Sequence, residues 1–408
     1  MSFDCFPTKL GALIEFSNGK ASPERLENGL WPVYGSNGSI GAANETNSAE
    51  ETIVVGRVGS YCGSVYFSPT RCWVTDNAIR GTAKGENSAT FLYYLLKHLN
   101  LNNWRSGSGQ PLLNQSTLNS IDVRVPQPSL QKEIGKILSD IDKRIALLRE
   151  TNSTLESIAQ ALFKSWFVDF DPVHANAGTQ ALSLPPEIQS LFPSTFVESP
   201  LGLVPEGWGV DQCQNLIDVR DGTHASPKES ETGFPLITSK HITSGKIRFD
   251  DAYLISEVDY VDISRRSAVH HLDVLITMIG TVGIPVFVLN EVTEFAIKNI
   301  GLFKTSKRPE FSCFIYLLLK SKDMQNLLES RLAGTTQKYL SLKALREIPL
   351  IVPSADVLGK FEEVASSIFK SVHTNNMQVE SLISLRDTLL PRLISGQLRL
   401  PEVEEMLQ

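Results

Sequence analysis

The sequence predicts an α+β protein in which two mixed α/β units are separated by an antiparallel pair of long coiled-coil helices, related by a pseudo-two-fold axis. Three observations predict this class. The chain carries two copies of one pattern, each copy contains short strand-like runs, and each copy ends in a long stripe of regularly spaced apolar residues. At 408 residues the chain also exceeds the size at which a single hydrophobic core stops growing, so we expect at least two packed units.

The two copies share a gapless register over more than fifty residues. The segment LNQSTLNSIDVRVP begins at Leu113 and LSLKALREIPLIVP begins at Leu340, an offset of 340 − 113 = 227 positions. Further upstream the copies still correspond, but with shifting offsets: IVVGRVGSYCGSVYF from Ile53 matches VLITMIGTVGIPVFV from Val274. Matching frame segments with loops of different length indicate a tandem duplication.

The variable part of each copy is predicted to be β-rich with some helix. Short β-branched and aromatic runs bounded by Gly, Asn and Ser are typical of strands, such as TIVVGRV and SVYFS in the first copy and VLITMI and VFVLN in the second. By length and period, SATFLYYLLKHLN (88–100) and EFSCFIYLLLKSKDMQNLLESRL (310–332) are predicted to be helical.

The part that follows in each copy predicts a long helix with a narrow apolar stripe. Apolar residues alternate in steps of three and four, with one gap at Asn152 in the first copy and one at Asn375 in the second, and Pro126 and Pro353 mark where the helices begin. Two ordinary core helices are the alternative, but the stripes are longer than a globular helix needs. The residues expected to pack between the helices are Ile134, Ile137, Ile141, Ile145, Leu148, Leu155, Phe361, Val364, Ile368, Val372 and Leu382.

Composition and motifs narrow the possible function. The longest nearly apolar run, 274–289, is too short and too interrupted to cross a bilayer, and the N-terminus lacks a signal-peptide pattern, so a cytoplasmic protein is expected. The five cysteines lack C-x-x-C spacing and are predicted to be core thiols rather than disulfides or metal ligands. We find no phosphate-binding, zinc-protease, nucleophile-elbow or amino-methyltransferase motif, so neither a catalytic residue nor a metal site is predicted.

Net charge by itself says little about partners. The formal charge is -7, but residues 1–126 sum to zero and 201–353 to −1, whereas 127–200 and 354–408 carry −3 each. By themselves, the near-neutral variable parts would attract the phosphates of a nucleic acid only weakly.

The variable loops contain residue types that read nucleic acid. Arg and Lys donate to guanine, Asn and Gln pair with adenine, and Gly lets the backbone approach phosphate. Plain turns are the alternative for any single loop. The candidate DNA-binding residues are Lys20, Asn37, Arg57, Tyr61, Arg105 and Gln110 in the first copy, and Thr223, His224, Lys240, His241, Lys246, Arg248, Gln337 and Lys338 in the second.

Four stretches carry a resemblance to a known family. ALFKSWFVDFDPV (161–173), LVPEGW (203–208), DGTHASPKESETGFPLITSKHI (221–242) and LRDTLLPRLISGQL (385–398) are similar to the specificity subunit of type I restriction-modification systems, and the likeness extends over essentially the whole chain. It implies target recognition domains at 1–126 and 201–353, each followed by a conserved helical spacer, at 127–200 and 354–408.

The resemblance also implies a function and a set of partners. The chain would be a non-catalytic subunit that reads double-stranded DNA, with each target recognition domain reading one half of a bipartite site and the helices setting the gap. Two modification subunits would bind S-adenosylmethionine and methylate adenine, and restriction subunits would use ATP and Mg to translocate and cleave DNA. Trp166, Phe167 and Phe170 would pack either against modification subunits or against this chain's own domains.

Two other function classes compete with this one. A helical scaffold without sequence-specific DNA binding would leave no selective footprint in any complex. A self-contained methyltransferase or nuclease would bind S-adenosylmethionine or cleave DNA by itself, and the missing motifs argue against it.

Overall fold

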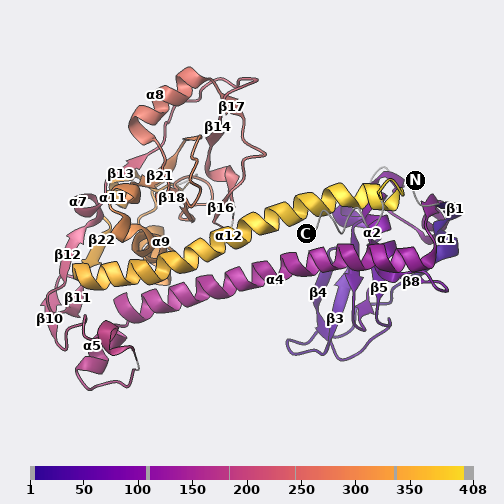
Figure 1. Ribbon diagram of the computed structural model, residues 1–408, viewed down its shortest axis with the longest axis horizontal. Helices are drawn as coiled ribbons and strands as arrows, with labels where there is room; N and C mark the ends of the chain where they lie inside the picture. Colours follow the sequence, from indigo (N-terminus) through magenta and orange to yellow (C-terminus); the bar gives the residue numbers. More distant parts are fainter. Residues whose placement is uncertain (1–4, 107–110, 183, 244, 335–337, 399–408) are drawn as a thin grey trace. The chain divides into compact units, whose positions relative to one another are not determined.

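The chain folds into two compact units, and both long helices contribute to each of them. The computed structural model describes residues 5–106, 111–182, 184–243, 245–334 and 338–398. Unit 1 comprises the described residues within 1–149 and 376–408, and unit 2 comprises those within 150–375. The long helices α4 (Pro128–Phe167) and α12 (Ala355–Ile394) therefore each pass through a unit boundary (Figure 1).

Unit 1 is built on a four-stranded antiparallel sheet with the strand order β2-β8-β5-β6. A second sheet has the order β4-β3-β7, in which β3 and β7 are parallel, and β1 pairs with β9. Its strands are β1 (Phe6–Lys9), β2 (Ile14–Asn18), β3 (Trp31–Gly35), β4 (Gly38–Ala43), β5 (Thr52–Gly56), β6 (Val65–Ser68), β7 (Trp73–Val74), β8 (Ala78–Ala83) and β9 (Asp122–Val125). Its short helices are α1 (Leu10–Leu13), η1 (Gly59–Tyr61), α2 (Ala89–His98), η2 (Leu101–Trp104) and α3 (Gln115–Ser120).

The core of unit 1 forms between this sheet and helices. Every residue of β5 is buried, and its run of β-branched side chains suits a strand covered on both faces. Helix α2 begins at a Ser88 cap and buries Phe91, Leu92 and Leu95 in the same cluster as Ile53. The first half of α4 and the last part of α12 complete this cluster, so the helix pair belongs to the core rather than standing outside it.

Unit 2 repeats these sheets one for one. The order β13-β21-β18-β19 corresponds to β2-β8-β5-β6, β17-β14-β20 corresponds to β4-β3-β7 with the same parallel pair, and β12-β22 corresponds to β1-β9. The duplication inferred from the sequence is thus confirmed at the level of topology, and so is the α+β class.

Unit 2 also contains additional elements, including the hairpins β10-β11 and β15-β16 and helix α8. Its strands are β10 (Phe196–Ser199), β11 (Gly202–Pro205), β12 (Gly209–Gln212), β13 (Val219–Asp221), β14 (Phe234–Ile237), β15 (Ile242–Thr243), β16 (Lys246–Ile247), β17 (Leu254–Ile255), β18 (Val274–Thr277), β19 (Pro285–Phe287), β20 (Ala296–Ile297), β21 (Ile300–Phe303) and β22 (Pro349–Val352). Its shorter helices are α5 (Asp171–Asn176), α6 (Pro186–Gln189), α7 (Cys213–Leu216), η3 (Ser239–His241), α8 (Glu257–Ser267), η4 (Thr305–Lys307), η5 (Pro309–Phe311), α9 (Ser312–Lys320), α10 (Lys322–Ser330) and α11 (Leu342–Arg346).

The two long helices run antiparallel within each unit. In unit 1, Asp142 in the first half of α4 accepts a hydrogen bond from Arg386 near the end of α12. In unit 2, Phe167 at the end of α4 packs on Phe361 near the start of α12, with ring centroids 4.8 Å apart. This is the antiparallel pairing predicted from the two apolar stripes.

The buried face of each helix drifts away from the predicted stripe. Six of the expected packing residues are buried and five are half-buried. The buried ones are Ile134, Ile141, Ile145, Leu148, Phe361 and Val372, and the half-buried ones are Ile137, Leu155, Val364, Ile368 and Leu382.

Beyond Asn152 the core positions on α4 are Ala159, Phe163 and Trp166, whereas Ile158, part of the predicted stripe, is half exposed. A straight helix of 3.6 residues per turn rotates away from a 3.5-residue repeat, so the stripe holds over only part of each helix.

The aromatic residues near the end of α4 form part of the core of unit 2. Trp166 and Phe167 are buried, and Phe170 lies 5.8 Å from Trp208 between ring centroids. Of the two alternatives for these residues, packing on the chain's own domain is confirmed for Trp166 and Phe167.

Two further sequence predictions can be compared with the structure. All five cysteines are buried and none of them forms a disulfide in the described part of the chain, as predicted for core thiols. Among the residues the structure describes, no helix combines the length and the apolar character that a membrane span requires.

A buried carboxyl group in unit 2 makes stability depend on pH. Glu362 of α12 accepts a hydrogen bond from the backbone N–H of Cys313 at 3.0 Å, at the start of α9. Burial raises the pKa of the Glu362 carboxyl from 4.5 to about 7, although the hydrogen bond from Cys313 favours the ionised form. Between these pH values the folded chain keeps a proton that the unfolded chain has released, so the free energy of unfolding falls as pH rises.

The variant Glu362→Gln is expected to remove this dependence. One pKa unit corresponds to about 1.4 kcal/mol, so the wild type should lose on the order of 3 kcal/mol between pH 4.5 and 7 that the variant retains. Urea unfolding at a series of pH values measures the difference. The neighbouring Glu363→Gln, which removes an exposed pair with Lys360, is the control and should follow the wild type. Parallel pH profiles for wild type and Glu362→Gln would refute the assignment.

Candidate nucleic-acid interface

In unit 1 the candidate site lies where the central strand β5 ends. The chain turns sharply there, with Gly63 N–H donating to the Gly56 carbonyl at 2.8 Å. A Cβ on Gly56 would lie 2.2 Å from the Tyr61 carbonyl oxygen, so only glycine fits this turn. The turn carries Arg57 and Tyr61 at the end of β5, and Tyr61 is half exposed.

Three other loops meet this turn. The Ser36–Asn37 turn between β3 and β4 is held to it because the Val58 N–H donates to Ser36 Oγ at 3.4 Å. Lys20 forms a parallel bridge to Thr75, just before β8. The segment after Arg105 is tied to the same turn, since Leu113 N–H donates to the Arg57 carbonyl at 2.9 Å.

The structure thus brings together five of the six candidates of the first copy. Lys20, Asn37, Tyr61 and Arg105 are exposed, and Arg57 is half-buried with a guanidinium N–H donating to the Asp76 carbonyl at 3.4 Å. Gln110 lies outside the described residues.

Arg105 also lies close enough to Cys62 to influence it. Burial raises the pKa of the Cys62 thiol and the nearby Arg105 charge partly opposes this.

Unit 2 builds the corresponding turn after β18 from different residues. Gly283 N–H donates to the Thr277 carbonyl at 2.9 Å, and Leu340 N–H donates to the Met278 carbonyl at 2.9 Å. This turn, helix α10 and Lys338 enclose a cavity of about 280 Å³. Gln325 of α10 holds the turn in place by donating to the Gly283 carbonyl at 2.8 Å. Lys338 is exposed, and the neighbouring candidate Gln337 lies outside the described residues.

Thr223 and His224 lie beside this turn, at the end of β13. Thr223 N–H donates to the Ile297 carbonyl at 3.0 Å and Thr223 is half-buried. Both ring nitrogens of His224 have partners in the chain, Asp221 at 3.0 Å and Asn299 at 2.7 Å. The exposed imidazole is therefore held in one orientation by its own unit.

One candidate is corrected by the structure. His241 is fully buried, and its Nδ1 accepts a hydrogen bond from the Thr238 N–H at 2.9 Å, which caps η3. Burial also lowers the pKa of its imidazole. His241 therefore supports the hairpin β15-β16 from inside and is not available at the surface. The sequence could not reveal this, because the Lys-His pair carries no sign of which side chain faces inward.

The remaining candidates of the second copy are exposed on or beside that hairpin. Lys240 lies in η3, Lys246 in β16, and Arg248 follows β16 and forms an ion pair with Asp251 at 2.8 Å. The segment between β14 and β17, which contains η3 and the hairpin β15-β16, corresponds to the Ser36–Asn37 turn of unit 1, because β14 pairs with β17 as β3 pairs with β4. Each unit therefore carries a different loop at the corresponding end of its own, equivalent sheet.

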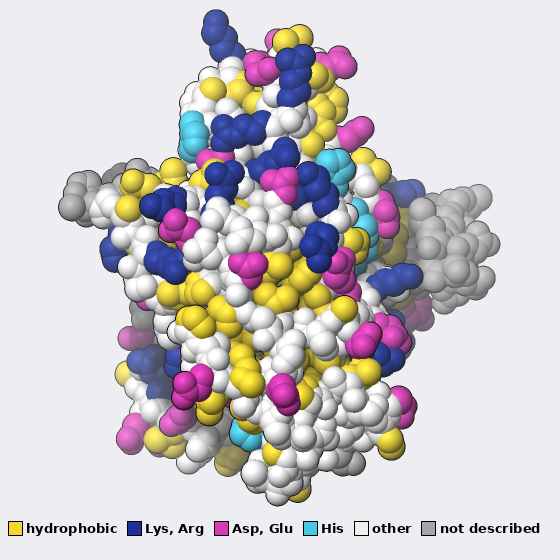
Figure 2. Space-filling model, turned by 90° about the vertical axis from the view of Figure 1, so that its left-hand side faces the viewer, with side chains coloured by type: hydrophobic (Ala, Val, Ile, Leu, Met, Phe, Trp, Pro, Cys, Tyr) yellow, Lys and Arg dark blue, Asp and Glu magenta, His cyan; other side chains and the backbone are white. Residues whose placement is uncertain are grey.

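Much of the positive charge in unit 2 is already paired. On the face seen in Figure 2, Lys and Arg side chains gather over the upper part and are interspersed with Asp and Glu. Asp218 accepts from both Arg220 and Lys307, at 2.7 Å each, and the hydrogen bond from Arg220 is the main cause that lowers the pKa of Asp218 to about 2. Such pairing leaves little net positive charge to attract phosphate.

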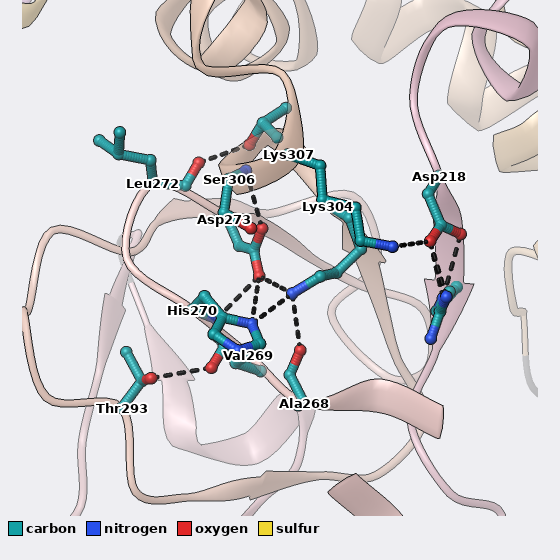
Figure 3. A network of polar contacts seen from close by, with 12 residues as sticks. Asp218, Ala268, Val269, His270, Leu272, Asp273, Thr293, Lys304, Ser306 and Lys307 are labelled. Carbon is teal, nitrogen blue, oxygen red and sulfur yellow. Dashed lines mark hydrogen bonds and ion pairs between the residues drawn. The ribbon is translucent and has the colours of Figure 1, made fainter. Parts of the chain in front are cut away.

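Unit 2 also contains a buried ion pair that no local sequence pattern indicates. Lys304, after β21, donates to Asp273 at 2.6 Å and to the Ala268 carbonyl at 2.8 Å (Figure 3). Its side chain is 5% exposed and that of Asp273 is fully buried. Burial lowers the pKa of the Lys304 ammonium and Asp273 opposes this. The pair braces β18 and β21 at the end of the sheet away from the turn after β18.

Comparison with known proteins places this architecture in context. A family model described as the type I restriction modification DNA specificity domain matches residues 7–157 and 205–378. The chain is 27% identical over 325 residues to the specificity subunit of the type I restriction enzyme MjaIX of Methanocaldococcus jannaschii, covering 77% of this chain and 70% of that protein. It is 28% identical over 340 residues to the HindI specificity subunit of Haemophilus influenzae, covering 72% of each.

A solved structure shares the fold. The S subunit of a type I restriction-modification system from M. genitalium superposes with a TM-score of 0.66 at 16% identity, covering 96% of both chains.

Proposed function

This chain belongs to the family of type I restriction-modification DNA specificity domains, and we propose that each of its two units reads one half of a bipartite DNA site. The observation that carries the proposal is the repeated convergence of loops. In both units the segment that follows the helical region is bonded to the turn after the central strand, through Leu113 in unit 1 and Leu340 in unit 2, and the residues on these loops differ. In unit 1 the hairpin tip is bonded to the same turn through Ser36. Similar frames with different loops fit two different half-sites.

The chemistry of the exposed loop residues supports DNA reading. Arg57, Arg105 and Lys338 can donate to guanine or to phosphate, and Asn37 can pair with adenine. Tyr61 offers a half-exposed ring that can pack against a sugar or a base edge. The paired charges around Asp218 and Arg248 leave a modest electrostatic attraction, so specific contacts rather than total charge would carry recognition.

We further propose that the chain works as a non-catalytic subunit of a larger complex. Two modification subunits would dock on it and supply S-adenosylmethionine and adenine methylation, and restriction subunits would supply ATP- and Mg-dependent translocation and cleavage. The α4-α12 pair would set the distance between the reading units and therefore the gap between half-sites. The relationship to specificity subunits and the near-neutral charge of residues 1–126 and 201–353 support this division of labour.

Loop substitutions test the reading of half-sites. In the complex with modification subunits, Tyr61→Ala combined with Arg105→Ala should relax selectivity at one half-site and weaken binding by about 30-fold or more, because each of the two lost base contacts costs on the order of 1–3 kcal/mol. Lys338→Ala should weaken binding and relax selectivity at the other half-site. Binding is measured on DNA libraries in which one half-site at a time is randomised.

The control for these variants is Lys136→Ala, on the exposed face of α4, which should leave both half-sites unchanged. Loss of selectivity at both half-sites from the unit 1 variant alone would contradict separate reading. A wild-type complex without any sequence-selective footprint would instead favour the helical scaffold.

A further inference from the structure

The two polar gaps in the apolar stripes of α4 and α12 meet each other. Asn375 Nδ2 donates to Asn152 Oδ1 at 2.8 Å, and Asn152 Nδ2 donates to the Val372 carbonyl at 3.3 Å. Asn152 is buried and Asn375 is half-buried, and both belong to unit 2. The asparagine that interrupts each apolar stripe therefore forms a hydrogen bond with the asparagine that interrupts the other.

A second polar contact joins the same helices in unit 1. Asp142 of α4 accepts from Arg386 of α12 at 2.7 Å and from the Tyr94 hydroxyl of α2 at 2.7 Å. Both ionic side chains are largely covered, at 29% and 20% exposure. Moving forward from 142 to 152 along α4 corresponds to moving back from 386 to 375 along α12, so the two contacts specify one antiparallel register.

The apolar stripe by itself does not fix that register. An apolar pattern that repeats every heptad presents an equivalent face after a slip of one heptad. Such a slip would place Asn152 against Ile368 or Leu382 and leave its buried amide without a partner. It would also separate Arg386 from Asp142. A buried polar group without a partner costs about 1–3 kcal/mol, so the polar contacts discriminate between registers that the repeating part of the stripe does not. At the end of α4 the packing of Phe167 on Phe361 favours the same register.

We propose that Asn152 and Asn375, assisted by Asp142 and Arg386, determine the length of the gap in the recognised DNA site by fixing the register of α4 against α12. This inference rests on the proposed function, in which the helix pair is the spacer between two reading units. These four residues contact one another between the two helices. They are positioning residues that restrict the complex to one gap length.

The test compares gap selectivity in the complete complex with modification subunits. The probe is a DNA library in which the two half-sites are separated by gaps of systematically varied length. The wild-type complex is expected to prefer one gap. In Asn152→Leu combined with Asn375→Leu, the preference for that gap over the next best one should fall at least about tenfold, because neighbouring registers no longer bury an unpaired amide. Thermal unfolding should show a variant at least as stable as the wild type.

A matched variant distinguishes the loss of the polar register contacts from the effect of adding leucine side chains. Ser153→Leu combined with Thr374→Leu makes the same kind of change at adjacent exposed positions, and it should keep the wild-type gap preference. An unchanged preference in the folded Asn152→Leu, Asn375→Leu variant would overturn the inference and leave the proposed function standing. A wild-type complex that shows half-site selectivity but no gap preference would overturn the spacer role itself. Should the leucine pair fail to fold, Arg386→Met tests the same claim, and an unchanged gap preference there also overturns it.

Discussion

Replacement of Asp273 by alanine is expected to destabilise unit 2 by about 3–5 kcal/mol. The substitution leaves the Lys304 ammonium buried at 5% exposure without its carboxylate, and removing one partner of a buried pair costs far more than the pair itself contributes. It also removes the acceptor for the backbone N–H groups of His270 and Ser306. Urea unfolding followed by hydrogen exchange in β18 and β21 measures the loss.

Two further variants test whether the loss of stability comes from leaving Lys304 buried without its carboxylate. Asp262→Ala removes an exposed pair with Arg265, whose side chains are each about three-quarters exposed, and should change the free energy of unfolding by less than about 1 kcal/mol. Asp273→Leu combined with Lys304→Met replaces the ion pair by apolar groups and should recover part of the loss. Equal stability of Asp273→Ala and Asp262→Ala would show that Lys304 does not depend on Asp273.

Insertion of one heptad into both long helices is expected to move the recognised site. Seven residues inserted after Glu150 and seven after Asn376 lengthen each helix by about 10 Å at 1.5 Å per residue. This distance corresponds to roughly three base pairs at 3.4 Å each, so the preferred gap should lengthen by about three. The original site would then contact one reading unit at a time, and binding of the complex to it should fall on the order of a thousandfold.

The same heptad in α4 alone is the control. It makes the Asn152–Asn375 contact incompatible with the Asp142–Arg386 contact and so breaks the common register, and neither the old nor the new gap should be strongly preferred. An unchanged gap in the doubly extended chain would refute the role of the helices as a spacer.

The sequence predicted the architecture well because the duplication imposes it twice. The strand runs around Ile53 and Val274 are buried central strands in equivalent sheets, and the two stripes are antiparallel helices. Apolar periodicity reports burial directly, and agreement between two copies removes much of the ambiguity of a single pattern.

The details of the site were less accessible from sequence. Positions such as Tyr61 and Lys338 are exposed on the loops where polar residues were expected, but His241 of the same loop set faces inward as a helix cap. The Lys304–Asp273 pair joins residues from separate segments, and no local pattern signals it. The gaps at Asn152 and Asn375 were visible as interruptions, whereas their contact depends on the register of two helices far apart in the chain.

Two units of one chain are proposed here to read one half each of a divided DNA site. Methylation-aware sequencing of DNA from cells that carry this chain with its modification subunits tests it most directly. We expect two short, different, specific segments separated by a gap of constant length and unspecified sequence. The Tyr61→Ala, Arg105→Ala variant should lose sequence selectivity in only one segment. One uninterrupted motif, or methylation without any motif, would contradict it.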